Sequence, residues 1–408
     1  MDVKIMPGML SGTVSAIPSK SMAHRALICA ALADKSSHIV CEGTSKDIEA
    51  TAMCLSSLGT EISRVQDGYI VHPLKRVDSG TIALMHCGES GSTFRFMLPI
   101  VGALGQECSF VLEGRLAERP LSPLYEELVR NGCKLSQQGS NPFNIDGKLK
   151  SGRYTLDAGV SSQFISGLLL ALPLLEGNSE IQLSGNIESF PYIELTLAMQ
   201  KIFGVEIEFK DMLFSIAGGQ TYRSPGTVSI EGDWSNAAFW FCASAISGNA
   251  ITVTGLDMES KQGDRAVLEI LERFGTDLHG IEIDAANIPD LVPILSVVAA
   301  AAKGTTVIYN AGRLRDKESD RLAAMVSVLG GLGADVRETK DGLIIRGGVP
   351  LTGGQVSSRG DHRIAMAATI AVALCTEPAI IQGAEAVDKS YPGFFDDLHL
   401  LGGLMQRI

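Results

Sequence analysis

Residues Cys87–Arg95 place two glycines and three hydroxyl side chains ahead of an arginine and an apolar run. Glycines allow backbone N–H groups to approach a ligand closely, and the N-terminus of a helix favours an anion. An arginine one turn into the helix can hold a phosphate or a carboxylate through two parallel hydrogen bonds. A serine N-cap after a tight turn would explain the same residues without a ligand. The anion-binding interpretation gains weight because the pattern recurs.

Polar or basic clusters precede five of six apolar helical stretches, at Ser19–Arg25, Gly88–Arg95, Ser161–Gln163, Pro289–Asp290 and Gly360–Arg363. Two more, Leu116–Pro120 and Arg313–Arg321, open amphipathic stretches, and helix capping or i,i+4 charge pairing could explain any one of these clusters. Together, however, they contribute seven of the cations that we single out in a chain of net charge −12, namely Lys20, Arg25, Arg95, Arg119, Lys317, Arg321 and Arg363. The eighth is Lys389, which stands before Ser390-Tyr391-Pro392. We therefore predict a cleft for two anionic ligands, formed by helix ends from two lobes, with Asp290 and Glu318 as proton-transferring groups.

An internal repeat supplies the elements that must position these residues. Amphipathic stretches end in glycine followed by a strand-like run at Gly59, Gly132, Gly204, Gly275 and Gly333, which by subtraction are 73, 72, 71 and 58 residues apart. Gly402 would close a sixth copy. Glycine with positive φ is the expected residue after the last helical turn.

Each copy also contains a second helical stretch that is apolar all round, and a β-branched run between its two helices. The pattern predicts an α/β (α+β) fold of two domains with three copies each, apolar helices inside and sheets outside. A Pro-Gly turn near residues 224–232 marks the boundary. Residues 1–14 read as an additional strand pair that needs partners elsewhere in the chain.

Composition excludes several classes of function. An apolar content of 45% with 20% charged residues is typical of a globular protein, and the negative balance disfavours a nucleic-acid or membrane partner. Eight cysteines without a C-x-x-C motif predict buried thiols in a cytoplasmic protein, without a disulfide framework or a metal site. The N-terminus has no signal-peptide pattern, and no apolar run of about 18 residues is uninterrupted.

With these motifs in their order, the chain resembles the 5-enolpyruvylshikimate-3-phosphate synthase family over residues 3–396. The resemblance rests on Ser19–Ser21 with Arg25, Gly88–Arg95, Arg119-Pro120, Ser161–Gln163, Pro289-Asp290, Lys317–Leu322 and Asp361–Arg363. It implies two inverse α/β lobes, each of three βαβαββ units, with the N-terminal strand belonging to the second lobe. The first lobe would then span residues 15–228, and the second residues 1–14 and 229–408.

The resemblance implies that the enolpyruvyl group of phosphoenolpyruvate is transferred to the 5-hydroxyl of shikimate 3-phosphate, with loss of phosphate from a tetrahedral intermediate. It implies a monomer that needs no metal or other cofactor. Asp290, Glu318 and Lys20 would be catalytic. The expected shikimate 3-phosphate ligands are Lys20, Ser21, Arg25, Ser161, Ser162, Gln163, Ser189, Asp290 and Lys317. The expected phosphoenolpyruvate ligands are Lys20, Gly91, Arg119, Gln163, Arg321, Arg363 and Lys389.

Four positions depart from the commoner family pattern, namely Glu89, Phe96, Phe190 and Arg313. Gly91 is retained, and in the family a glycine there leaves room for glyphosate in the phosphoenolpyruvate pocket. We therefore predict inhibition by glyphosate that is competitive with phosphoenolpyruvate.

Three alternatives remain to be weighed. The related enolpyruvyl transferase acting on UDP-N-acetylglucosamine would have Lys-Asn at Lys20-Ser21 and a reactive cysteine in the loop before Arg119-Pro120. In this chain that loop, Glu113–Glu118, contains no cysteine, and Cys108 lies in a strand-like run. RNA 3′-phosphate cyclases share a related repeat, but the acidic balance disfavours RNA. A non-catalytic binding module would keep the cations and lose Asp290 or Glu318, and both are present.

Overall fold

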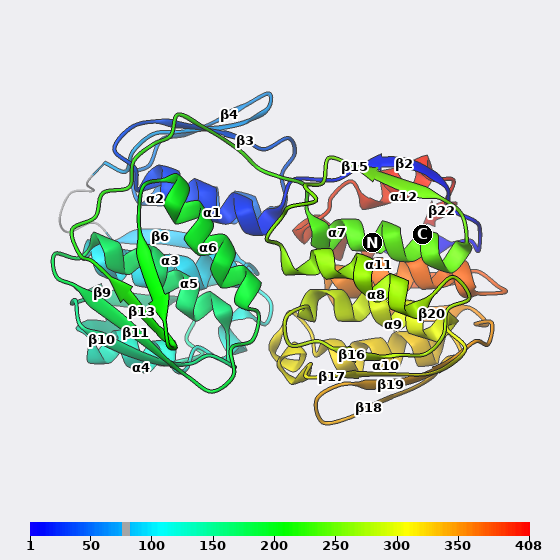
Figure 1. Cartoon of the computed structure of the whole chain (residues 1–408). Coiled ribbons are helices and arrows are strands. Elements are labelled where there is room, and N and C mark those ends of the chain that lie inside the picture. The colour runs from blue at the N-terminus through cyan, green and yellow to red at the C-terminus, as the bar shows by residue number, and fades with distance from the viewer. Residues whose placement is uncertain (76–81) are drawn as a thin grey trace. The chain divides into compact units, whose positions relative to one another are not determined.

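A computed structural model describes residues 1–75 and 82–408 (Figure 1). The chain divides into two compact units. Unit 1 contains Met1–Ile17 and Glu231–Ile408, and unit 2 contains Pro18–Ile230. The sequence had placed these two transitions at 14/15 and 228/229. The chain therefore begins in unit 1, forms all of unit 2, and returns to complete unit 1.

Unit 2 is built around three helices whose residues are buried on almost every face. They are α1 (Lys20–Ala31), α3 (Gly91–Leu104) and α5 (Ser162–Ala171). Three further helices each present one side to this core: α2 (Lys46–Ser57), α4 (Leu124–Arg130) and α6 (Phe190–Ile202). A helix that is apolar all round is stable only inside, as the sequence predicted.

Three four-stranded sheets surround these helices, and each has one parallel pair followed by an antiparallel hairpin. The first contains β14 (Thr227–Ser229), β3 (Ser37–Val40), β5 (Gly68–Val71) and β4 (Ile62–Val65). The second contains β6 (Ala83–Gly88), β7 (Cys108–Leu112), β9 (Phe143–Gly147) and β8 (Cys133–Leu135). The third contains β10 (Arg153–Asp157), β11 (Ser179–Ser184), β13 (Leu213–Ile216) and β12 (Ile207–Lys210).

Unit 1 repeats this plan. Its buried helices are α7 (Trp234–Ser247), α9 (Val292–Ala301) and α11 (His362–Ala371). Its amphipathic helices are α8 (Val267–Phe274), α10 (Arg321–Gly331) and α12 (Phe394–Leu400). One sheet contains β16 (Glu282–Asp284), β17 (Gly304–Tyr309), β19 (Leu343–Gly347) and β18 (Asp335–Glu338).

The two N-terminal strands find their partners in unit 1, as the sequence required. Strand β1 (Val3–Ile5) lies antiparallel between β21 (Ala379–Gln382) and β22 (Met405–Arg407), in a sheet completed by β20 (Gly354–Ser357). Strand β2 (Gly12–Ser15) pairs in parallel with β15 (Ile251–Thr254). This fourth copy has a two-stranded sheet, which agrees with the shorter 58-residue glycine spacing that follows it.

The repeated glycines have the backbone conformation that the sequence predicted. Gly59, Gly132, Gly204, Gly275, Gly333 and Gly402 all have positive φ after an amphipathic helix. A residue with a Cβ would be strained there, so these glycines let the chain leave the helix and start the next strand.

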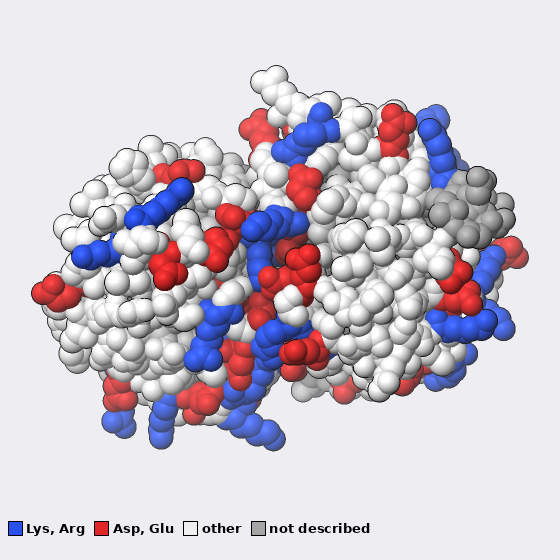
Figure 2. All heavy atoms as spheres, turned by 180° about the vertical axis from the view of Figure 1, so that it is seen from behind, with Lys and Arg blue, Asp and Glu red and all other residues white. Residues whose placement is uncertain are grey.

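On the face shown in Figure 2, basic and acidic side chains are intermingled. All eight cysteines are buried as free thiols. Within the described ranges, none of the helices combines the length and the apolarity needed to cross a membrane.

Candidate functional site

At the start of α3, the backbone of Gly91 lies close to the guanidinium group of Arg119. The hydroxyl of Ser90 caps the helix by accepting a hydrogen bond from the N–H of Thr93 at 3.3 Å. Gly91 is the first helical residue, and a Cβ on it would lie 2.8 Å from Nη1 of Arg119. Glycine at this position therefore leaves the room that the Arg119 side chain occupies. The structure thus brings together two residues that the family resemblance assigned to one ligand.

Arg95 links three segments of unit 2. Its Nη1 donates to Oε1 of Gln163 at 2.8 Å, and its Nη2 donates to the carbonyl of Pro120 at 2.9 Å. The amide of Gln163 donates in turn to Oγ of Ser92 at 2.9 Å. The sequence suggested that Arg95 could clamp an anion; instead, both terminal nitrogens bond to protein acceptors, so Arg95 connects α3 to α5 and to the turn after Arg119.

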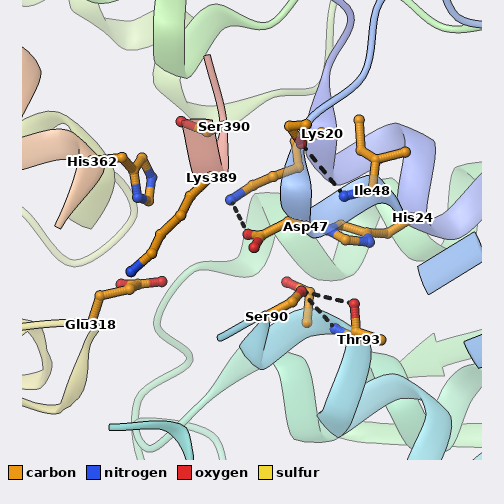
Figure 3. Close-up of polar contacts among 12 residues, drawn as sticks. Lys20, His24, Asp47, Ile48, Ser90, Thr93, Glu318, His362, Lys389 and Ser390 are labelled. Atoms are coloured by element: carbon orange, nitrogen blue, oxygen red, sulfur yellow. Dashed lines mark hydrogen bonds and ion pairs between the residues drawn. The ribbon is translucent and has the colours of Figure 1, made fainter. Parts of the chain in front are cut away.

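Lys20, the first residue of α1, forms an ion pair with a neighbouring helix (Figure 3). Its Nζ lies 2.8 Å from Oδ2 of Asp47 in the first turn of α2, and both side chains are mostly buried. The carboxylate holds the ammonium group near the start of α1 and compensates its charge. Sequence reasoning missed Asp47, because nothing in the local pattern around it distinguishes it from an ordinary first-turn acid.

Arg25, one turn further along α1, is 2% exposed and bonds to four groups. It donates to the carbonyls of Ser21 and Tyr192 and to the hydroxyls of Thr196 and Ser166, at 2.7 to 3.4 Å. Its guanidinium also lies 5.0 Å from the ring centre of Phe96, within cation–π range. Arg25 therefore connects the starts of α1 and α6 and places a buried positive charge next to both.

The serines assigned to shikimate 3-phosphate all lie at helix starts. Ser161 is the N-cap of α5 and accepts from the N–H of Gln163 at 3.3 Å, and Ser162 is the first helical residue. Ser189 precedes α6 with a φ of 55° and is 3% exposed. Left-handed backbone at a residue with a Cβ is strained and is concentrated at functional sites.

In unit 1, one guanidinium group organises three carboxylates. Arg321 donates from Nη1 to Asp290 at 2.9 Å, from Nη2 to Glu318 at 2.9 Å and from Nε to Asp361 at 2.8 Å. Arg321 is 2% exposed and Asp361 is fully buried. Burial lowers the pKa of Arg321, but the three carboxylates outweigh it and raise that pKa overall. The two acids predicted for proton transfer are thus held by one arginine.

Asp290 is shared between two arginines. Nη2 of Arg363 lies 3.0 Å from Oδ2 of Asp290, and its Nη1 donates to the Asp290 carbonyl at 3.3 Å. Burial would raise the pKa of Asp290, but Arg363, Lys317 and Arg321 hold it well below its usual range. In the arrangement seen here, Asp290 is therefore a stable carboxylate and a weak base.

Two lysines complete the cationic set of unit 1. Burial, opposed by the charge of Asp290, lowers the pKa of Lys317 to about 8. Lys389 is 8% exposed and donates from Nζ to the carbonyl of Gly360, just before the start of α11, at 2.6 Å. Lys389 therefore lies near Arg363, which is one residue into that helix.

Asp361 has more partners than the sequence indicated. Its carboxylate caps α11 by accepting from the N–H of Arg363 at 3.0 Å, and it also accepts from Ser319 and Arg321. The motif Asp361–Arg363 was visible in the sequence, but Arg321, the partner of Asp361, is 40 residues away along the chain.

The sequence also gave no indication of Asp264, whose pKa is raised to about 7 by burial and by the charge of Asp290.

Comparisons with known proteins give a consistent result for this chain. The family model described as EPSP synthase (3-phosphoshikimate 1-carboxyvinyltransferase) matches residues 5–398. Enzymes named 3-phosphoshikimate 1-carboxyvinyltransferase from Clostridium kluyveri and Clostridium acetobutylicum are 44% and 45% identical to the chain, covering 98% of it and 97% of each relative. A solved structure of EPSP synthase from Acinetobacter baumannii has a TM-score of 0.82 at 25% identity, with 100% of both chains covered.

Proposed function

The chain belongs to the EPSP synthase family, and from that premise we propose how its residues carry out the family's reaction. That reaction is the transfer of the enolpyruvyl group of phosphoenolpyruvate to shikimate 3-phosphate in the shikimate pathway. It needs binding of two phosphorylated anions, removal of a hydroxyl proton, and delivery of a proton to the methylene carbon of phosphoenolpyruvate. The chain has candidate residues for each of these tasks.

We assign shikimate 3-phosphate to the helix starts of unit 2 together with Lys317 and Asp290 of unit 1. Backbone N–H groups at the starts of α5 and α6 favour a phosphate, and the hydroxyls there donate further hydrogen bonds. The residues are Lys20, Ser21, Arg25, Ser161, Ser162, Gln163 and Ser189. Arg25 supplies positive charge and holds Ser21 and Tyr192 in place, since most of its donors already bond to protein.

We assign phosphoenolpyruvate to Gly91 and Arg119 of unit 2 and to Arg321, Arg363 and Lys389 of unit 1, with Lys20 and Gln163 serving both substrates. Arginine suits this ligand because its planar fork matches both carboxylate and phosphate. The close approach of Gly91 to Arg119 supports a binding role, since any side chain at residue 91 would occupy that space.

Asp290 accepts the proton of the attacking hydroxyl, and Glu318 with Lys20 transfers the proton to the methylene carbon. The pairing of both acids with Arg321 is the observation that carries this assignment. An anion that binds Arg321 and Arg363 weakens their hold on Asp290, so the Asp290 pKa rises and the carboxylate becomes a better base once phosphoenolpyruvate is bound.

The test is phosphate release from phosphoenolpyruvate with shikimate 3-phosphate as acceptor, and with UDP-N-acetylglucosamine as the control acceptor. We expect release only with shikimate 3-phosphate. Release only with the sugar nucleotide would contradict the assignment, and binding of both substrates without release would indicate a binding module. We further propose a cytoplasmic monomer without a metal or other cofactor; light scattering of the purified chain would test the monomer.

A further inference from the structure

Helix α2 carries none of the residues assigned to substrates, yet its buried side chains contact two helices that do. Asp47 pairs with Lys20 on α1. One turn later, the hydroxyl of Thr51 lies 2.7 Å from Nδ1 of His24 on α1 and 2.7 Å from the hydroxyl of Thr93 on α3. His24, Thr51 and Thr93 are all completely buried.

The hydrogen bonds form a chain that runs in one direction and ends at the start of α3, where Figure 3 shows the last link, between Thr93 and Ser90. The hydroxyl of Thr93 donates to Oγ of Ser90 at 2.8 Å. Thr93 must then accept from the hydroxyl of Thr51, and Thr51 must accept from Nδ1–H of His24. This requires a proton on Nδ1 of His24, which the neutral Nδ1–H tautomer supplies. Burial, with the charges of Lys20 and Arg25, keeps the His24 pKa well below its usual value.

Thr51 is the only member of this chain that lies on α2, and its hydroxyl serves as both acceptor and donor. Without it, the Nδ1–H of His24 and the acceptor oxygen of Thr93 would be buried and unsatisfied, which is costly. Thr93 and Ser90 would then shift toward other partners. Because Ser90 directly precedes Gly91, such a shift would move the backbone that faces Arg119.

We propose that Thr51 is a positioning residue for phosphoenolpyruvate. Acting through Thr93 and Ser90, it holds the start of α3 at the spacing from Arg119 that an anion needs. The inference rests on the proposed assignment of Gly91 and Arg119 to phosphoenolpyruvate. A misplacement of about 1 Å in groups that position a substrate can cost about 10²-fold in rate, so a small shift at the start of α3 matters.

The experiment compares Thr51→Val, which removes the hydroxyl at constant shape, with Thr51→Ser, which keeps the hydroxyl and removes a methyl group. Thr60→Val is the matched control, because Thr60 is also buried and its hydroxyl has no hydrogen-bond partner among the described residues. Steady-state kinetics would be measured at saturating shikimate 3-phosphate. We expect Thr51→Val to raise the KM for phosphoenolpyruvate about tenfold, with kcat changed less than about threefold. Thr51→Ser and Thr60→Val should stay within about twofold of the unaltered chain.

If Thr51 served only to fill space, Thr51→Ser should raise the KM for phosphoenolpyruvate more than Thr51→Val does, because serine leaves a cavity and valine fills the space. A KM in Thr51→Val equal to that in Thr60→Val, or equal damage from Ser and Val, would overturn the proposal. If Thr51→Val does not fold, Thr93 can be replaced instead, because it is the next member of the hydrogen-bond chain. Thr93→Val breaks the hydrogen-bond chain there, and Thr93→Ser preserves it. Equal KM values in that pair would also overturn it.

The activity of the unaltered chain separates this proposal from the proposed function. Phosphate release that depends on shikimate 3-phosphate establishes the function whatever Thr51 does. If the unaltered chain releases no phosphate, the proposed function fails, and the Thr51 proposal, which depends on it, is overturned too.

Discussion

Nε of Arg321 donates to Oδ2 of Asp361 at 2.8 Å, and neither side chain is more than 2% exposed. Asp361 also caps α11, so one carboxylate fixes both the arginine and the helix that carries Arg363. Removing one charge of a buried pair leaves the other uncompensated. Asp361 therefore connects the stability of unit 1 to the geometry of its anion-binding residues.

Asp361→Asn should destabilise the protein by about 3 kcal/mol, because the buried Arg321 charge loses a partner. Denaturant unfolding measures this, with Asp335→Asn as the control. Asp335 makes a long 3.9 Å contact with Arg346 and is 68% exposed. Asp335→Asn should therefore lower the free energy of unfolding by less than about 0.5 kcal/mol. Equal effects of the two substitutions would contradict the role given to Asp361.

Asp290→Asn and Glu318→Gln should each lower kcat by about 10²-fold or more, because each removes a proton-transferring carboxylate while preserving shape. Calorimetric titration with shikimate 3-phosphate should show that binding survives in Glu318→Gln, since Glu318 is not assigned to that ligand. Near-normal kcat in either variant would disprove its proton-transfer role.

The pKa of Lys317, lowered to about 8, predicts a pH dependence. Below that pH the ammonium is charged and attracts shikimate 3-phosphate; above it the charge is lost. The kcat/KM for shikimate 3-phosphate, which reports the free enzyme, should therefore fall by up to about tenfold per pH unit above pH 8. Lys317→Arg keeps its charge throughout this range and should remove that decline. A decline that persists in the arginine variant must come from another group.

Gly91→Ala should raise the KM for phosphoenolpyruvate, because the new Cβ would lie 2.8 Å from Nη1 of Arg119 and displace it. We expect an increase of about tenfold, with glyphosate inhibition weakened by at least as much. Gly393→Ala is the control, since a Cβ there meets nothing within 4 Å. Unchanged inhibition in Gly91→Ala would mean that glyphosate does not depend on the space beside Arg119.

Much of the fold was predictable because it depends on local and periodic features. Helices apolar on all faces must lie inside, glycines at regular spacing must end helices, and Val3 to Val14 had strand character without a nearby partner. Partner strands were beyond prediction, since β1 pairs with residues more than 370 positions away. Pairing over such separations depends on the whole fold rather than on a local pattern.

In the candidate site, too, some features follow from the local sequence and others depend on tertiary packing. Residue type and position predicted the helix starts around Lys20, Gly91 and Arg363, because helix capping and charge act over a single turn. Only the tertiary structure decided that Arg95 bonds to Gln163 and that Arg321 bonds to Asp361. It also decided that Thr51, an unremarkable residue in the sequence, lies between His24 and Thr93. The physical reason is that a hydrogen bond needs atoms within about 3 Å, and only packing brings distant residues so close.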